Sequence, residues 1–151
     1  MEFEKTALIT APVERVWSML LDPGVMAACV PGMESIQVLS DTDYVVTLQV
    51  KISFITARFK VNTSIREARA PTYLRSEGTG EDATLTSSLK LSSEVFLEDR
   101  GEGSMELRMK LKVDVFGRLG GFGLNVIKTK ADRMWEEFGR NLALRVQAPA
   151  P

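Results

Sequence analysis

The 151-residue chain contains no histidine, and Cys29 is its only cysteine. Without histidine, the usual general base near neutral pH is absent, and Ser-His and Cys-His nucleophile pairs are excluded. A single cysteine excludes an intramolecular disulfide and a zinc site built from several thiolates. We therefore expect no metal or other cofactor, and we interpret Cys29 as a small buried apolar residue.

The chain also lacks a charge imbalance and long apolar runs. Its 19 basic and 20 acidic residues give a net charge of -1, which provides no general attraction to nucleic acid or to an anionic membrane. No apolar run approaches the roughly 20 residues of a membrane-spanning helix, and the N-terminus has no signal-peptide pattern. We expect a cytoplasmic protein with one domain over residues 1–147 and a short tail over 148–151.

The beginning of the chain indicates a strand followed by two short helices. Residues 3–10 alternate like a strand, and residues 11–21 change to helical spacing with Pro12 at the first helical position. Asp22 is expected to cap a second helix, which starts at Pro23 and ends before Pro31.

From Met33 to Phe116 the apolar residues recur at every second position. This period is typical of an antiparallel sheet with one buried and one solvated face. Six strands are expected, over residues 33–39, 44–54, 58–66, 72–80, 84–97 and 105–115. The alternation continues to Phe54, which we therefore expect on the buried face.

The last segment returns to helical spacing. The apolar residues expected on one side of this helix are Leu119, Phe122, Val126, Met134, Phe138, Leu142 and Val146. About 25 residues of helix would span roughly 35–40 Å, enough to cross a curved sheet. The order predicts an α+β helix-grip fold, in which a seven-stranded curved antiparallel sheet surrounds a long C-terminal helix and two short helices follow the first strand. The glycines before this helix (Gly117, Gly120, Gly121 and Gly123) indicate a turn with close packing, or a flexible gate at the mouth of a cavity.

Together with this order, residues 11–23 (APVERVWSMLLDP) resemble the START/SRPBCC superfamily. Residues 29–35 (CVPGMES) look like the Cys-apolar-Pro-Gly-x-Glu-Ser stretch of the carbon monoxide dehydrogenase G-subunit family. Residues 48–51 (LQVK) and 78–80 (GTG) are similar to two further motifs of that family, although leucine replaces the usual first valine of LQVK. The resemblance covers residues 3–146. It implies a protein that helps a molybdenum hydroxylase to mature, or links it to the membrane or to quinone.

The inward-facing stripe of the sheet and the apolar side of the last helix are expected to enclose a groove, where a ligand would bind. Because the lining is apolar and includes adaptable methionines, a quinone-like or lipid-like molecule fits it better than a charged metabolite. The candidate ligand-binding residues are Val50, Ile52, Phe59, Val61, Leu89, Leu91, Met109, Leu111, Val113, Phe122, Val126 and Met134.

Three functions are consistent with this sequence. The first is a non-catalytic protein that binds a hydrophobic molecule and serves a carbon monoxide dehydrogenase or related molybdenum hydroxylase. The second is a maturation or membrane-recruitment factor without a stable ligand. The third is a cyclase-like enzyme, which would need a buried carboxylate, whereas the acidic residues from Glu67 to Asp114, including Asp82, are expected mostly on outward positions or turns. We expect no nucleic-acid partner and at most peripheral membrane contact.

Overall fold

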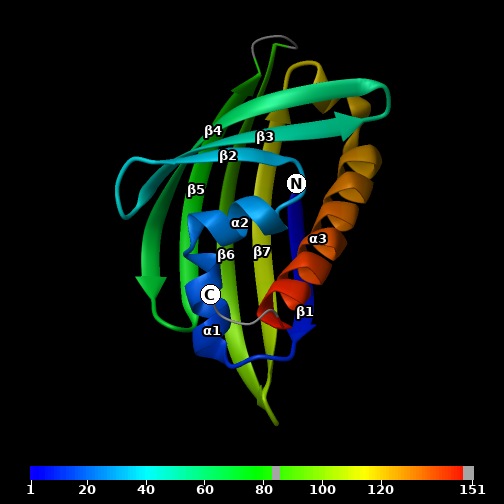
Figure 1. Cartoon of the computed structure of the whole chain (residues 1–151). Helices are drawn as coiled ribbons and strands as arrows, with labels where there is room; N and C mark the ends of the chain where they lie inside the picture. Colours follow the sequence, from blue (N-terminus) through cyan, green and yellow to red (C-terminus); the bar gives the residue numbers. More distant parts are fainter. Residues whose placement is uncertain (83–85, 148–151) are drawn as a thin grey trace.

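The chain forms one curved antiparallel sheet, crossed by a long C-terminal helix (Figure 1). A computed structural model describes residues 1–82 and 86–147, so the tail and the first two residues of the strand predicted over 84–97 lie outside the described residues. The elements are β1 (Glu2–Ile9), α1 (Val13–Leu20), α2 (Pro23–Cys29), β2 (Met33–Val38), β3 (Asp43–Ile52), β4 (Ile55–Arg69), β5 (Tyr73–Asp82), β6 (Ser87–Gly101), β7 (Ser104–Phe116), the 3-10 helix η1 (Leu119–Phe122) and α3 (Leu124–Gln147). The predicted helix-grip fold is confirmed.

The sheet has the strand order β1-β7-β6-β5-β4-β3-β2. Successive strands from β2 to β7 are neighbours, whereas β1 pairs with β7 at the opposite edge from β2. The connection through α1 and α2 therefore passes across the concave face, on the same side as α3 (Figure 1). This arrangement leaves α2 and α3 facing each other over the sheet.

The ends of the short helices follow local rules. Asp22 caps α2 as predicted, because its Oδ1 accepts hydrogen bonds from the backbone N–H groups of Gly24 and Val25 at 2.9 and 3.3 Å. Pro12 was predicted at the first helical position, but it precedes the first helical residue by one position. Its backbone is extended, with φ -67° and ψ 150°, so it is the cap residue and α1 begins at Val13.

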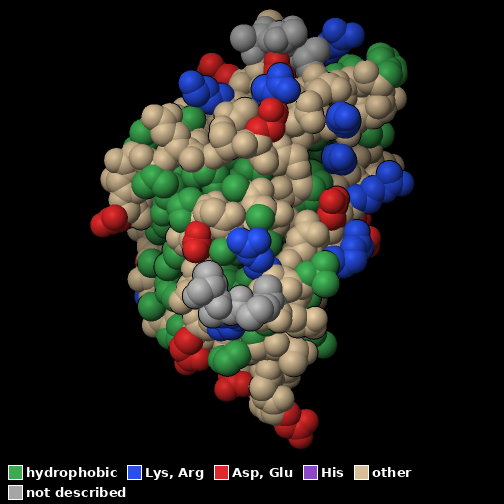
Figure 2. All heavy atoms as spheres, viewed as in Figure 1, with side chains coloured by type: hydrophobic (Ala, Val, Ile, Leu, Met, Phe, Trp, Pro, Cys, Tyr) green, Lys and Arg blue, Asp and Glu red, His purple; other side chains and the backbone are tan. Residues whose placement is uncertain are grey.

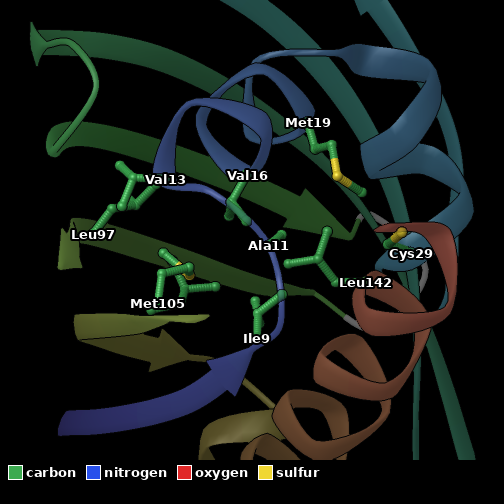
Figure 3. Packing of buried hydrophobic residues seen from close by; sticks show 10 residues of the cluster. Ile9, Ala11, Val13, Val16, Met19, Cys29, Leu97, Met105 and Leu142 are labelled. Atoms are coloured by element: carbon green, nitrogen blue, oxygen red, sulfur yellow. The ribbon is translucent and has the colours of Figure 1, made fainter. Parts of the chain in front are cut away.

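Two apolar clusters divide the core. The first cluster lies where α1, α2 and the C-terminal part of α3 meet the sheet (Figure 3). Its centre includes Val16, Met105 and Leu142, whose side chains are fully buried. The second cluster lies under η1 at the other end of the sheet and consists of Ile52, Ile55, Ala57, Phe59, Val61 and Leu119.

The prediction that Phe54 faces the core was wrong. Ile52 pairs with Ile55, so β3 ends at Ile52, and Ser53 and Phe54 form a two-residue hairpin loop. Ser53 has a φ of 56°, which is typical of such turns. The side chain of Phe54 is 86% exposed. The apolar alternation continues through the turn, which is why the period alone did not reveal it.

Candidate functional site

An apolar cavity of about 380 Å³ lies between α3, α2 and the concave face of the sheet. All but one of the lining residues are apolar, and the exception is Lys5. The lining residues are Phe3, Lys5, Leu20, Met26, Val30, Pro31, Leu74, Val95, Leu107, Met109, Leu111, Ala131, Met134, Trp135 and Phe138. The volume falls within the range of about 300–1,000 Å³ that is typical of sites for small organic ligands.

A second cavity, of about 230 Å³, lies on the other side of α2, against β2 and the middle of the sheet. It shares Leu20, Met26, Val30 and Leu74 with the larger cavity. The hydrophobic surface between α2 and β2 is visible in Figure 2. These four residues therefore lie at the boundary between the two cavities.

Few polar groups lie near this apolar space. Lys5 extends from the inner face of β1 and forms an ion pair with Asp132 of α3. Trp135 donates a hydrogen bond from Nε1 to the backbone oxygen of Thr6 at 3.0 Å, which fixes its ring at the cavity wall. On the inner face of the sheet, the hydroxyls of Ser76 and Ser93 are hydrogen-bonded to each other at 2.8 Å.

The structure brings together only some of the predicted ligand-binding residues. Met109, Leu111 and Met134 line the larger cavity. Val113 is half-buried on β7 and lines neither cavity. Three predicted residues belong to the second core cluster: Ile52, Phe59 and Val61. Val50, Leu89 and Leu91 of the sheet and Phe122 of η1 pack against that cluster.

Val126 does not lie on the groove side of α3, and its side chain is 41% exposed. Sequence reasoning extended the apolar side upstream in steps of four residues, from Phe138 through Met134 to Val126. Each step of four turns the side chain by about 400°, so the direction drifts by about 40° per step on a helix with 3.6 residues per turn. Three steps move Val126 by about 120°, away from the sheet.

Sequence reasoning missed several lining residues. Lys5 and Phe3 share the inner face of β1, but a lysine in a strand is normally assigned to solvent. Pro31 and Ala131 carry no apolar periodic signal, and they line the cavity because α2 and α3 meet there. Two lining residues of α3 did carry a usable signal: Phe138 lies on the predicted apolar side of this helix, and Trp135 lies directly beside it.

Ionisable groups with catalytic potential do not gather at this cavity. Among the described residues, no acidic side chain lines it, and no group of three His, Cys, Asp or Glu side chains is placed to hold a metal ion. Cys29 is buried as predicted, and desolvation raises the pKa of its thiol, while the charge of Arg145 acts in the opposite direction. The outward placement predicted for Asp82 was wrong, since this side chain is buried. It accepts a hydrogen bond from the backbone N–H of Arg58 at 2.5 Å, near the second core cluster.

The glycine-rich segment before α3 forms a turn with close packing. Gly117 has a φ of 82°, and a Cβ placed on it would lie 2.1 Å from the backbone oxygen of Thr86. A Cβ on Gly120 would lie 2.6 Å from the backbone oxygen of Val115. Both positions therefore require glycine for steric reasons. The alternative function of this segment, as a gate, stays a prediction.

Comparison with solved structures assigns the fold to the START-like class. A conserved protein from Geobacillus kaustophilus superposes with a TM-score of 0.89 at 17% identity, covering 97% of this chain and 95% of that one. A START superfamily protein from Mycobacterium smegmatis gives a TM-score of 0.74 at 15% identity, covering 97% of both chains. The Zhui aromatase/cyclase from Streptomyces sp. R1128 gives 0.71 at 16% identity, covering 97% of this chain and 93% of that one. These similarities show the fold alone, because one fold can carry unrelated functions.

The family is defined by sequence. The profile of the carbon monoxide dehydrogenase G-subunit (CoxG) family matches residues 6–147, and the chain belongs to this family. A search of curated proteins found no significant match. In the described part of the chain, no helix is both long and apolar enough to cross a membrane.

Proposed function

We propose that this protein is a non-catalytic carrier of a quinone-like or lipid-like molecule, and that it serves a carbon monoxide dehydrogenase or a related molybdenum hydroxylase. The observation that carries the proposal is the apolar cavity of about 380 Å³ under α3. A cavity of about 150 Å³ lined by aliphatic and aromatic side chains is enough to bind benzene. The larger space here has room for a substituted ring or a bent alkyl or isoprenoid chain.

Most of the lining favours a guest with a flexible apolar part. Met26, Met109 and Met134 approach the cavity from three different elements, and their unbranched side chains adapt to irregular shapes. Trp135 and Phe138 form an aromatic wall, with ring centroids 5.6 Å apart. A flat conjugated ring would stack well on such a wall.

Lys5 provides a single polar contact at the edge of this space. Its ammonium group is paired with Asp132, so no unpaired charge is buried when the cavity is empty. A carbonyl or phosphate oxygen of a guest can accept a hydrogen bond from the same ammonium group, which has three donors. We therefore propose that the guest is an amphiphile whose polar head lies beside Lys5 and whose apolar part fills the cavity.

The chemistry of the lining supports a non-catalytic role. Acid–base catalysis needs a titratable group within hydrogen-bonding distance of the substrate. Among the residues that the structure describes, Lys5 is the one with a charged side chain that lines the larger cavity. The match to the CoxG family supports a link to carbon monoxide dehydrogenase. The alternative, an interaction factor without a stable ligand, is supported by the second core cluster, which fills the η1 end of the groove with the protein's own side chains.

Titration with decylubiquinone and with oleate tests the proposal. Trp135 lines the cavity, so a bound quinone should quench its fluorescence with saturation at one equivalent. Lys5→Met should weaken binding about tenfold, because it removes a charge-assisted hydrogen bond of about 1.5 kcal/mol. The matched control is Lys110→Met, on the outer face of the adjacent strand β7, and it should bind like the wild type. No saturable uptake of either compound would favour the interaction factor.

A further inference from the structure

Two serine hydroxyls form a polar pair on the inner face of the sheet. Ser76 of β5 and Ser93 of β6 are directly opposite each other in the register, and their Oγ atoms are 2.8 Å apart. Both side chains are half-buried. Figure 1 shows the two strands in the middle of the sheet, behind α1 and α2. We call these two residues the serine pair.

The serine pair lies where the two cavities adjoin. Ser76 lines the second cavity and is two residues from Leu74, which lines both cavities. Ser93 is opposite Leu111 of β7 and two residues from Val95, and both of these line the larger cavity. Residues two apart on a strand lie on the same face of the sheet. A guest that extended from the larger cavity into the second one would therefore pass over the serine pair.

The serine pair keeps one hydrogen-bond donor free. The two hydroxyls carry two hydrogens, and their mutual bond uses one of them. Across residues 1–82 and 86–147, neither hydroxyl has a further hydrogen-bond partner. Either oxygen can be the donor in the mutual bond. When Ser93 donates to Ser76, the hydrogen of Ser76 is therefore free for an acceptor in the second cavity.

Packing of the sheet does not require two hydroxyls at this place. The neighbours of the serine pair in the same cross-strand row are Ile65 of β4 and Leu111 of β7. Apolar β-branched residues are the usual choice at such inner positions. A half-buried hydroxyl without its full set of hydrogen bonds is destabilising, and a guest that supplies an acceptor offsets this cost.

The second cavity favours an uncharged acceptor. Among the described residues, none with a charged side chain lines this cavity. A carboxylate or phosphate would lose its water here without gaining a counter-charge. A carbonyl oxygen has no such penalty and accepts a hydrogen bond from a hydroxyl. A charged head therefore belongs beside Lys5, and an uncharged oxygen belongs beside Ser76.

We propose that Ser76 donates a hydrogen bond to a carbonyl oxygen of the guest, whose apolar part fills both cavities. The inference rests on the carrier function, because it concerns the same bound molecule. Lys5 and Ser76 are three strands and two residues apart in the register, or about 16 Å on a flat sheet. With C–C bonds of about 1.5 Å, this is close to the distance from the first to the twelfth carbon of an extended acyl chain. The guest is therefore an amphiphile with a carbonyl group roughly twelve carbons from its head.

Isothermal titration calorimetry of the whole chain with two acids that differ by one oxygen tests the proposal. The acids are octadecanoate and 12-oxo-octadecanoate. Ser76→Ala should weaken the binding of 12-oxo-octadecanoate about tenfold, because the carbonyl is then buried without a donor. The same variant should bind octadecanoate at least as tightly as the wild type does, since an alkyl chain makes no hydrogen bond with the missing hydroxyl.

A second variant separates ligand binding from a purely structural role of the serine pair. Ser93→Ala breaks the same bond between the two hydroxyls but keeps the hydroxyl of Ser76. If the pair served only to join β5 to β6, Ser76→Ala and Ser93→Ala should have the same effect on both acids. The proposal instead predicts that Ser93→Ala binds 12-oxo-octadecanoate within about threefold of the wild type.

Matched controls locate the hydrogen bond. Ser92→Ala removes a hydroxyl from the outer face of β6, one residue from Ser93, and should bind both acids like the wild type. Thr63→Val removes another hydroxyl that lines the second cavity and should leave the binding of 12-oxo-octadecanoate unchanged. The isomer 6-oxo-octadecanoate carries its carbonyl nearer the head, and its binding should not respond to Ser76→Ala.

Three outcomes would overturn the proposal. The first is a change in affinity by the same factor for both acids in Ser76→Ala, including no change for either. The second is a selective loss of 12-oxo-octadecanoate binding in Thr63→Val, which would assign the hydrogen bond to the other hydroxyl. The third is an absence of binding of both acids to the wild type. Decylubiquinone titration separates this last result from a failure of the carrier function, because uptake of the quinone alone would leave that function in place.

Discussion

Partial filling of the cavity should weaken ligand binding strongly without unfolding the protein. Ala131 is a half-buried residue of α3 that lines the cavity, and Ala131→Phe adds a benzene-sized group to it. A cavity of about 150 Å³ accommodates benzene, so the new ring should take roughly two-fifths of the 380 Å³. A guest that fills the cavity would lose roughly 100 Å² of apolar contact, which at about 25 cal/mol per Å² amounts to about 2.5 kcal/mol. The expected result is a Kd about 60-fold weaker.

The assay is quenching of Trp135 by decylubiquinone, combined with thermal unfolding. The free energy of unfolding should change by less than about 1 kcal/mol, because the new ring occupies empty space, and Tm should move by no more than about 3 °C. Ala143→Phe is the matched control: Ala143 is a half-buried alanine of the same helix that lines neither cavity. If Ala131→Phe bound decylubiquinone as tightly as the wild type and the control, the ligand would not occupy this cavity.

Three further predictions concern packing and ionisation. Leu107 is 1% exposed, so Leu107→Ala should lower the free energy of unfolding, measured by urea denaturation, by about 2–5 kcal/mol. Leu8 is 75% exposed, so Leu8→Ala should change it by less than about 0.5 kcal/mol. Similar losses for both variants would contradict the assigned core. Native Cys29 should react with a thiol reagent at least about 100-fold more slowly than in urea, because burial raises the pKa of its thiol; rapid labelling of folded protein would contradict this. Asp43 accepts hydrogen bonds from Ser64, Thr42 and Ser40, which lower its pKa in the folded state. Its stabilisation is therefore complete above the unfolded pKa and lost as pH falls through the folded pKa. Asp43→Asn should be less stable than the wild type at neutral pH, and the gap in Tm should close as pH falls through the folded pKa. A gap that did not depend on pH would rule out the carboxylate as its source.

The fold was predictable because its strands alternate cleanly. On β7, Met105, Leu107 and Met109 face inward, and charged residues occupy the positions between them, so the period reveals both the strand and its buried face. The N-terminal signals of α2 were equally local, since the Asp22 side chain caps the helix that Pro23 begins. Such features depend on residues close together in sequence.

On strand β5, apolar alternation did not reveal which residues face the core. Its inner row is Leu74, Ser76, Gly78, Gly80 and Asp82, which carries almost no apolar signal. A Cβ on Gly80 would lie 2.9 Å from Val61 Cγ2 and 3.3 Å from Leu89 Cδ1. The inner row of β5 therefore has a glycine here because side chains of the neighbouring strands β4 and β6 occupy the space. Asp82 was assigned to solvent for the same reason, since polarity was the available guide.

The position of the cavity was not predictable from periodicity. Apolar stripes show which side chains face the groove, but the empty space depends on where α3 crosses the sheet and on how far η1 closes one end. Phe59 and Met109 belong to the same kind of stripe, yet Phe59 is core and Met109 lines the cavity. That difference arises from tertiary packing and not from either residue's neighbours in sequence.

Native mass spectrometry of the purified protein, before and after extraction with organic solvent, tests the central claim most directly. The account predicts a stoichiometric apolar adduct that extraction removes, and a mass increase of one equivalent when decylubiquinone or oleate is added back. A mass equal to that of the bare chain, with no uptake of either compound, would contradict the account and leave the interaction factor as the better explanation of this fold.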